Sequence, residues 1–315
     1  MSHISALEVI IWDANGNASL DQVFPLGWPP PVPPVPVPSG PPPTGTPTAP
    51  AWPSFAGNAQ FVGTSPSGRV TVWVDPSLGA PALQNATDLL NDSDRIVQAN
   101  DKIFGTIGGH VDAIVFALGG ATDGTGGADH NGCDYSTGAA IEVCASFGTS
   151  VRCSALFEAE LSECSMNGQL CGVSTGEALS RWCSMVIGLN SLSDFVSAPT
   201  WDQDGRPDFV DTVDPTDQNY DSIGCGMAFI SWVMSLGFTL GQVAVTMVLL
   251  GDSGTLANLY ATLTSKDAGT AWATFTAALS GKTILDDDPF GALAAQLSKK
   301  VHLQPGSKRM LPAKK

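Results

Sequence analysis

Proline is the residue that most restricts how this chain can fold. Residues 25–54 contain 14 of the 23 prolines in the 315-residue sequence. Because proline lacks a backbone N–H and has a fixed φ angle, this stretch cannot continue a helix or occupy the middle of a sheet. Such sequences form extended polyproline II structure. We therefore expect a semi-rigid linker over 25–54, which separates an N-terminal segment, residues 1–24, from a main domain at 55–298.

The two ends of the chain are expected to serve attachment. Residues 4–12 alternate apolar and polar side chains, and Asn15-Gly16 is a strong hairpin turn signal before a return strand at 20–24. A lone hairpin is marginally stable in water, so residues 1–24 should dock on their own core, on a protein partner or on a second copy. Residues 299–315 carry six of the 14 basic residues and are expected to be a disordered basic tail.

The composition excludes some classes of partner. The chain has 14 Lys and Arg against 30 Asp and Glu, a formal net charge of −16. Nucleic acids and anionic membranes bind basic surfaces, so neither is expected as a partner of the main domain. No apolar run reaches the roughly 20 residues that span a bilayer. The first residues lack an ordinary secretory signal, which leaves the compartment open between the cytoplasm and export by a non-classical route.

The main domain is predicted to place strands before helices. Apolar or alternating runs predict strands at 69–74, 111–118 and 139–146, and a long amphipathic helix at 81–104. Beyond residue 222 the pattern predicts helices at 223–236, 240–250, 255–263, 270–279 and 289–297. Strands followed by helices are typical of an α+β domain.

A glutamate-rich stretch lies between these two halves. Residues 155–166 are rich in good helix formers, and Glu160 and Glu163 are three apart, so they share one face of a helix. Ser174 is a candidate N-cap for a second helix, with Glu177 as its capping-box partner. Glu177 can also pair with Arg181 at i,i+4. The two helices therefore bring three carboxyl groups into the same region, either as a site or as a solvated, structural face.

This stretch resembles the active-site region of zincin metallopeptidases, which carry an H-E-x-x-H helix. In Ala159-Glu160-Leu161-Ser162-Glu163 the glutamate is kept, but alanine and glutamate stand where the two zinc histidines would be. The segment 176–181 resembles the downstream helix of gluzincins that supplies a third ligand. The resemblance implies an N-terminal mixed sheet, Glu160 as general base, and Glu163 and Glu177 as metal ligands. Zinc is not expected, because both histidines are absent, and carboxylates suit Ca²⁺, Mg²⁺ or Mn²⁺ better.

More broadly, residues 68–280 are similar to a group of bacterial proteins of unassigned function that share an R-P-D-(F/W)-V loop and an S-I-G-C helix. The expected function is that of a catalytically degenerate metallopeptidase-like protein with a binding, structural or assembly role. The enzyme alternative is a metal-dependent hydrolase that uses Glu160, Glu163 and Glu177. A third alternative is a calcium-stabilised interaction module.

The calcium alternative depends on an acidic loop. Asp202, Asp204, Asp208 and Asp211 follow the spacing D-x-D-G-x-x-D-x-x-D, which resembles the calcium loops of thrombospondin type 3 repeats. Calcium takes six to eight oxygen ligands, and clustered aspartates can supply them, so Ca²⁺ is the candidate cofactor. The alternative is that these aspartates cap turns and helices, as Asp221 would as an N-cap.

Cysteine and glycine add two further expectations. The seven cysteines lie between residues 133 and 225; an odd number leaves at least one unpaired, and no C-x-x-C zinc motif is present. A glycine-rich segment at 119–134 contains Asp123, Asp129, His130 and Asp134. It is predicted to be a mobile surface loop, with the alternative that it holds an anion or a cation.

Overall fold

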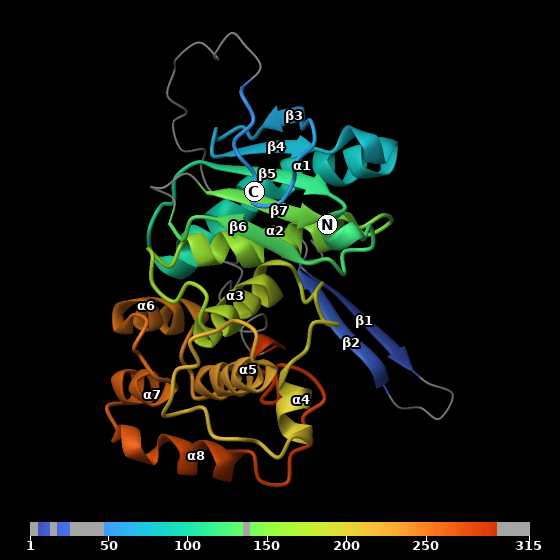
Figure 1. The fold of residues 1–315 in the computed structure, drawn as a ribbon. Helices are drawn as coiled ribbons and strands as arrows, with labels where there is room; N and C mark the ends of the chain where they lie inside the picture. The colour runs from blue at the N-terminus through green and yellow to red at the C-terminus, as the bar shows by residue number, and fades with distance from the viewer. Residues whose placement is uncertain (1–5, 13–17, 26–46, 135–138, 295–315) are drawn as a thin grey trace, which may run out of the picture.

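The computed structural model describes residues 6–12, 18–25, 47–134 and 139–294, and it has an α+β fold (Figure 1). Its centre is a five-stranded mixed sheet whose strand order is β3-β4-β5-β7-β6. The inner strands β4, β5 and β7 run parallel, and the edge strands β3 and β6 are antiparallel to their neighbours. The strands are β3 (Gln60–Thr64), β4 (Val70–Val74), β5 (Val111–Phe116), β6 (Ala128–Asn131) and β7 (Ala140–Cys144).

One face of the sheet is covered by two helices, α1 (Gly79–Phe104) and α2 (Ser150–Cys164). The amphipathic pattern of α1 buries Leu89 and Ile96, and α2 buries Phe157 and Leu161 in the same cluster. These side chains meet the apolar residues that the inner strands turn toward the helices, such as Val72, Ala113 and Val143. Apolar burial on this scale is the main source of stability of the domain.

The opposite face of the sheet is covered by the C-terminal end of the proline-rich stretch and by the residues that follow it. Trp52 and Phe55 form edge-to-face contacts with Trp73 and Phe116. The carboxylate of Glu142 is fully buried on β7. It accepts hydrogen bonds from the backbone N–H and the hydroxyl of Ser54 and from the backbone N–H of Phe55. The C-terminal end of the predicted linker, from residue 49 onward, therefore packs on the core; residues 26–46 lie outside the described chain.

Helices make up the C-terminal half of the domain, as predicted for residues 223–279 (Figure 1). The helix predicted at 289–297 lies partly outside the described residues, which end at 294. The core of this half is rich in stacked aromatic rings, including the pairs Trp201–Phe275 and Trp232–Tyr260. No helix in the described residues is long and apolar enough to cross a membrane. The helices are α3 (Ser174–Ile187), α4 (Ala198–Gln203), α5 (Tyr220–Ser235), α6 (Leu240–Leu250), α7 (Leu256–Thr264) and α8 (Ala271–Ala278), with short 3-10 turns at Pro76–Leu78, Leu118–Gly120 and Ala268–Thr270.

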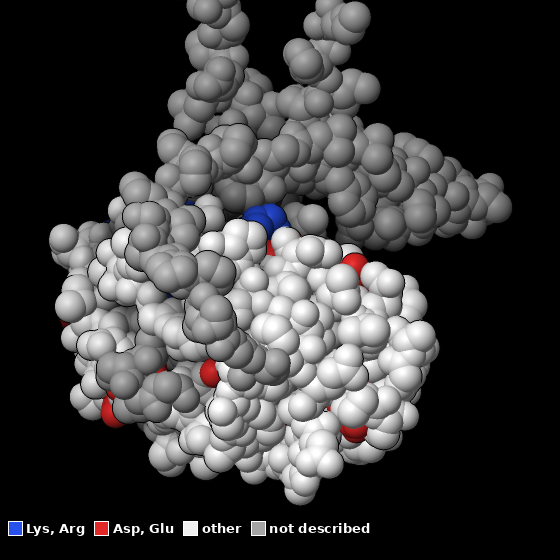
Figure 2. Space-filling model, turned by 90° about the horizontal axis from the view of Figure 1, so that it is seen from above, with Lys and Arg blue, Asp and Glu red and all other residues white. Residues whose placement is uncertain are grey.

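The N-terminal strands β1 (Ala6–Trp12) and β2 (Ala18–Pro25) pair antiparallel, as the alternating pattern predicts. Their turn at 13–17 and the basic tail at 299–315 lie outside the described residues. Charged atoms are scattered over the face shown in Figure 2, and most of the described surface on that face is neutral.

Three local predictions are wrong. The segment 119–134 is not a simple surface loop, because it contains strand β6. Ser174 is not the N-cap of α3: Val173 holds that position without a side-chain hydrogen bond, and Ser174 bonds to Ser222 instead. The N-cap of α5 is Asn219 rather than Asp221, because the Asn219 amide oxygen already accepts the first free N–H groups of that helix.

Candidate metal centre

A cleft of about 410 Å³ lies where β6, α2 and α3 meet, and we call it the glutamate cleft. Strand β6 is the edge of the sheet nearest the helical half, so side chains from both halves reach it (Figure 1). It is lined by His130, Glu160, Glu163, Glu177 and Arg181, among others. The three glutamates thus converge in one cleft, as expected.

Helix α2 supplies two of the carboxylates. Glu160 and Glu163 are three residues apart, and their side chains are 15 % and 11 % exposed. The intervening Leu161 points the other way, into the core beneath the sheet. Because α2 is buried along that face, the two carboxylates are held on a fixed element rather than on a loop.

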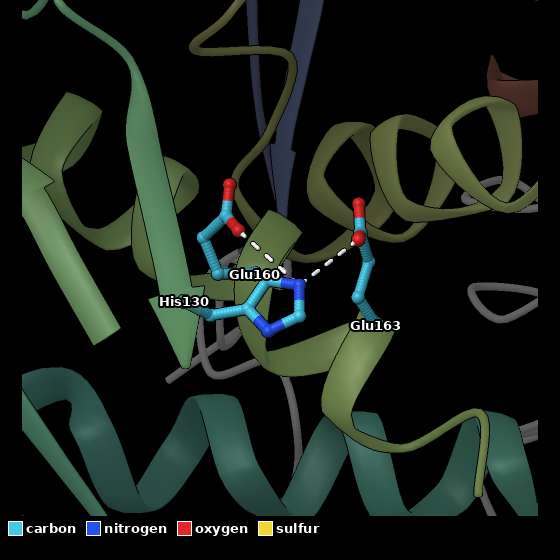
Figure 3. A group of neighbouring side chains, drawn as sticks. All are labelled: His130, Glu160 and Glu163. Atoms are coloured by element: carbon cyan, nitrogen blue, oxygen red, sulfur yellow. Dashed lines mark hydrogen bonds and ion pairs between the residues drawn. The ribbon is translucent and has the colours of Figure 1, made fainter. Parts of the chain in front are cut away.

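Strand β6 adds a histidine that the sequence analysis placed in a surface loop. His130 pairs in register with Ile141 of β7, which turns its ring toward α2. Its Nε2 atom lies 3.2 Å from Oε2 of Glu163 and 3.9 Å from Oε2 of Glu160. Figure 3 shows both carboxylates directed at this one ring nitrogen.

The second ring nitrogen of His130 fixes the orientation of the imidazole. Nδ1 lies 2.9 Å from the carbonyl oxygen of Gly132, to which it donates, and 3.9 Å from Sγ of Cys164. A backbone carbonyl that holds Nδ1–H leaves Nε2 facing the cleft, the arrangement that metal-ligating histidines adopt in proteins. The ring is therefore held with Nε2 directed at the carboxylates.

Burial and neighbouring charges strongly shift the pKa values of the ionisable groups in the cleft. Burial lowers the pKa of His130, but hydrogen bonds with Cys164 and Glu163 and the charge of Glu160 outweigh burial and raise it to about 12. Burial raises the pKa of Glu160 well above its usual value, and repulsion from Glu163 adds to this effect. With no metal bound, His130 is thus an imidazolium at neutral pH, and it offsets the charge of the carboxylates beside it.

Glu177 is held by an arginine from the next turn of α3. Nε of Arg181 donates to Oε1 of Glu177 at 2.6 Å, the expected i,i+4 pair, and its Nη1 donates to the Phe195 carbonyl oxygen at 2.8 Å. Burial raises the pKa of Glu177 to about 7; Arg181 opposes this rise, and the neighbouring Glu163 contributes to it. Glu177 therefore lies next to Glu163, in contact with both a cation and a carboxylate.

Three ligand atoms in the cleft lie close enough to bind one ion. The atoms from His130, Glu160 and Glu163 are all within 4.8 Å of one another, and they form the one such group found among the described residues. One imidazole nitrogen with two carboxylates is a donor set used for divalent transition metals. The residues present therefore fit a metal ion, with Glu177 adjacent to the group.

The aspartate loop is organised by hydrogen bonds within the protein. Nε of Arg206 lies 2.6 Å from Oδ1 of Asp202, and Asp208 accepts a hydrogen bond from the backbone N–H of Val210. Asp204 faces Asp221, where burial and the nearby Asp204 carboxylate raise the pKa of Asp221. Within residues 198–221, all of which are described, Asp202, Asp204, Asp208 and Asp211 form no group of three converging ligand atoms.

The cysteines divide into one disulfide and five buried thiols. Cys133 and Cys171 are bonded, with 6.0 Å between their Cα atoms and a sequence separation of 38. The pairing could not be deduced from the sequence, since seven cysteines allow many connectivities. The free thiols are Cys144, Cys153, Cys164, Cys183 and Cys225.

Comparison of the chain with protein-family models, with curated proteins and with solved structures finds no match in any of the three. The geometry of the glutamate cleft is therefore the observation from which function can be inferred.

Proposed function

We propose that the glutamate cleft binds a divalent metal ion and that the chain is a metal-dependent hydrolase of zincin-like architecture. The observation that carries this proposal is the convergence of His130, Glu160 and Glu163 on one point in a cleft. The two histidines of the zincin helix are absent, but strand β6 supplies one imidazole from outside that helix. The ion is expected to be Zn²⁺ or Mn²⁺ rather than Ca²⁺, because the donor set includes a nitrogen.

In this proposal the glutamates have distinct tasks. His130, Glu160 and Glu163 would hold the ion, and the Nδ1 contact with Gly132 would keep Nε2 in place. A bound divalent ion would supply Lewis-acid chemistry and lower the pKa of a coordinated water. Glu177, next to Glu163 and oriented by Arg181, is left as the carboxylate for proton transfer. This assignment exchanges the roles that the zincin resemblance implies for Glu160 and Glu177.

Calorimetric titration of the full chain, after treatment with a chelator, tests the proposal. Zn²⁺ and Mn²⁺ should bind with one site per chain, and Glu163→Gln should weaken binding by at least about 10-fold, since even the loss of an outer-shell partner has an effect of that size. Glu158→Gln, on the same helix but outside the cleft, is the matched control and should bind normally. Equal effects of both substitutions, or no binding by the wild type, would refute the metal site.

Two further substitutions test whether Glu160 or Glu177 is the metal ligand. Glu160→Gln should lose metal binding, whereas Glu177→Gln should bind metal within a few-fold of the wild type and lose hydrolytic activity on a peptide library. If Glu160→Gln keeps the metal and Glu177→Gln loses it, the assignment implied by the resemblance is the correct one.

A specific observation favours a second candidate, a catalytically degenerate protein whose cleft binds a partner without metal. The His130 imidazolium already lies between Glu160 and Glu163, where it can take the place of a cation. In that case the wild type binds no divalent ion, and His130→Gln destabilises the fold by leaving two buried carboxylates without a cation.

A further inference from the structure

The disulfide Cys133–Cys171 joins the segment that carries His130 to the connection between the two glutamate helices. Cys133 lies three residues after His130, and Cys171 lies between α2 and α3. The chain enclosed between the two cysteines includes strand β7 and helix α2, and so both Glu160 and Glu163. The segment that carries His130 and the helix that carries the carboxylates are therefore linked covalently.

Strand β6 is held by its pairing with β7 and by packing against α2. It has four residues, it is an edge strand, and it pairs with β7 on one side only. The chain before it is rich in glycine, including Gly124 and Gly127, both of which have positive φ angles. Short edge segments of this kind are among the least stable parts of a fold. A tether after the strand therefore has a large influence on where His130 lies.

Two backbone hydrogen bonds next to Cys133 add to this tether. The Cys133 carbonyl accepts the N–H of Gly168 at 3.1 Å, in the same α2–α3 connection. The preceding residue, Gly132, accepts the Nδ1–H of His130. The ring orientation thus depends on a carbonyl adjacent to the disulfide-bonded residue. Glu160 and Glu163 need no such tether, because α2 is packed along its length between α1 and α3.

We propose that the Cys133–Cys171 disulfide is a positioning bond for His130, and that its reduction releases His130 and weakens metal binding in the glutamate cleft. This inference rests on the proposed metal site. Both cysteines are half-buried, so a reductant can reach them, whereas the other five thiols are buried. The thiol redox state of the surroundings then controls how many of the three ligands are in place.

The reaction is an ordinary thiol–disulfide exchange. A dithiol reductant transfers two electrons and two protons; the S–S bond breaks, Cys133 and Cys171 become thiols, and the reductant becomes a disulfide. In the laboratory a phosphine can replace the dithiol, and it becomes a phosphine oxide with an oxygen atom from water. No metal chemistry takes part in this step.

Mn²⁺ titration of the full chain in oxidised and phosphine-reduced form tests the proposal. Reduction should weaken Mn²⁺ binding by the wild type by at least about 10-fold, the effect of losing a partner that orients a ligand. Cys133→Ser/Cys171→Ser should show the weak affinity in both conditions. His130→Gln should be insensitive to reduction, because the bond acts through His130; a loss of the same size in His130→Gln would overturn the inference.

Nuclear magnetic resonance of the histidine ring separates this inference from the metal site itself. In the metal-free oxidised wild type the His130 ring signals, assigned by comparison with His130→Gln, should report a fixed, hydrogen-bonded imidazolium. Reduction should move them to the positions of a solvated histidine. If they do not move, the positioning role is wrong whether or not metal binds. If they move and no metal binds to the oxidised chain, only the proposed metal site fails.

Discussion

Glu158 of helix α2 has a fully buried carboxyl group, and neither of its oxygens has a hydrogen-bond partner among the described residues. Burial raises its pKa well above the usual value, which the charge of Arg95 only partly offsets. A buried polar group without a partner costs about 1–3 kcal/mol. Glu160, Glu163 and Glu177 each lie within 4 Å of a His130 or Arg181 nitrogen, whereas Glu158 has no such ion pair among the described residues.

Replacement of Glu158 should therefore be tolerated. We expect Glu158→Gln to leave the free energy of unfolding unchanged or to increase it, and the gain should be larger at high pH. A carboxyl whose folded pKa is raised contributes most below its unfolded value near 4.5 and loses that contribution as pH rises. Urea denaturation of both proteins at pH 5 and pH 8 measures this. A loss above about 2 kcal/mol at both pH values would show a hydrogen-bonding role for Glu158.

His130 should remain protonated at neutral pH while no metal is bound. Its pKa is raised to about 12, so the ring nitrogens should give imidazolium chemical shifts throughout pH 6 to 9. By the same sign rule, the stability that His130 contributes is complete below its unfolded pKa near 6.5 and declines as pH rises toward 12. A titration midpoint near 6.5 would contradict the close contact of His130 with Glu163.

At the scale of elements, the regular segments were predictable and the strand that completes the site was not. The apolar periodicity of α1 and the β-branched run of β4 gave their positions to within about two residues. Strand β6 has the sequence Ala-Asp-His-Asn, which has no apolar alternation. It is a strand because β7, distant in sequence, offers it a partner. Glu160 and Glu163 were found from helical spacing, and Glu177 from a capping pattern and the gluzincin resemblance. His130 was named only within a glycine-rich loop that could hold a cation, because its place beside the glutamates depends on this long-range pairing.

Glu142 shows how one side chain on β7 fixes the start of the main domain. It accepts hydrogen bonds from the Ser54 backbone at 2.9 Å, the Ser54 hydroxyl at 2.5 Å and the Phe55 backbone at 2.6 Å. Glu142→Gln removes the charge from these bonds and should destabilise the domain by about 1–3 kcal/mol. Ser54→Ala, which removes only one bond, should cost about half as much. If urea denaturation shows that neither substitution changes the free energy of unfolding, the contacts around Ser54 do not stabilise the sheet.

At the scale of the whole molecule, the β1–β2 hairpin remains a candidate for attachment to a partner or to a second copy. A two-stranded sheet has edges and faces that it cannot cover alone. A chain shortened to begin at residue 47 keeps Trp52 and the Glu142 contacts, so we expect its main domain to fold as in the full chain. If the hairpin mediates self-association, light scattering should show a larger particle for the full chain than for the shortened one. Two monomers of equal stability would exclude that role.

X-ray absorption spectroscopy of the full chain loaded with zinc is the most direct test of the central claim, that His130 completes a metal site with Glu160 and Glu163. We predict one ion per chain. Its coordination shell should contain a single imidazole nitrogen at about 2.0–2.1 Å together with carboxylate oxygens. The imidazole contribution should disappear in His130→Gln. A first shell of oxygens alone in the wild type, or an imidazole contribution that survives His130→Gln, would contradict it.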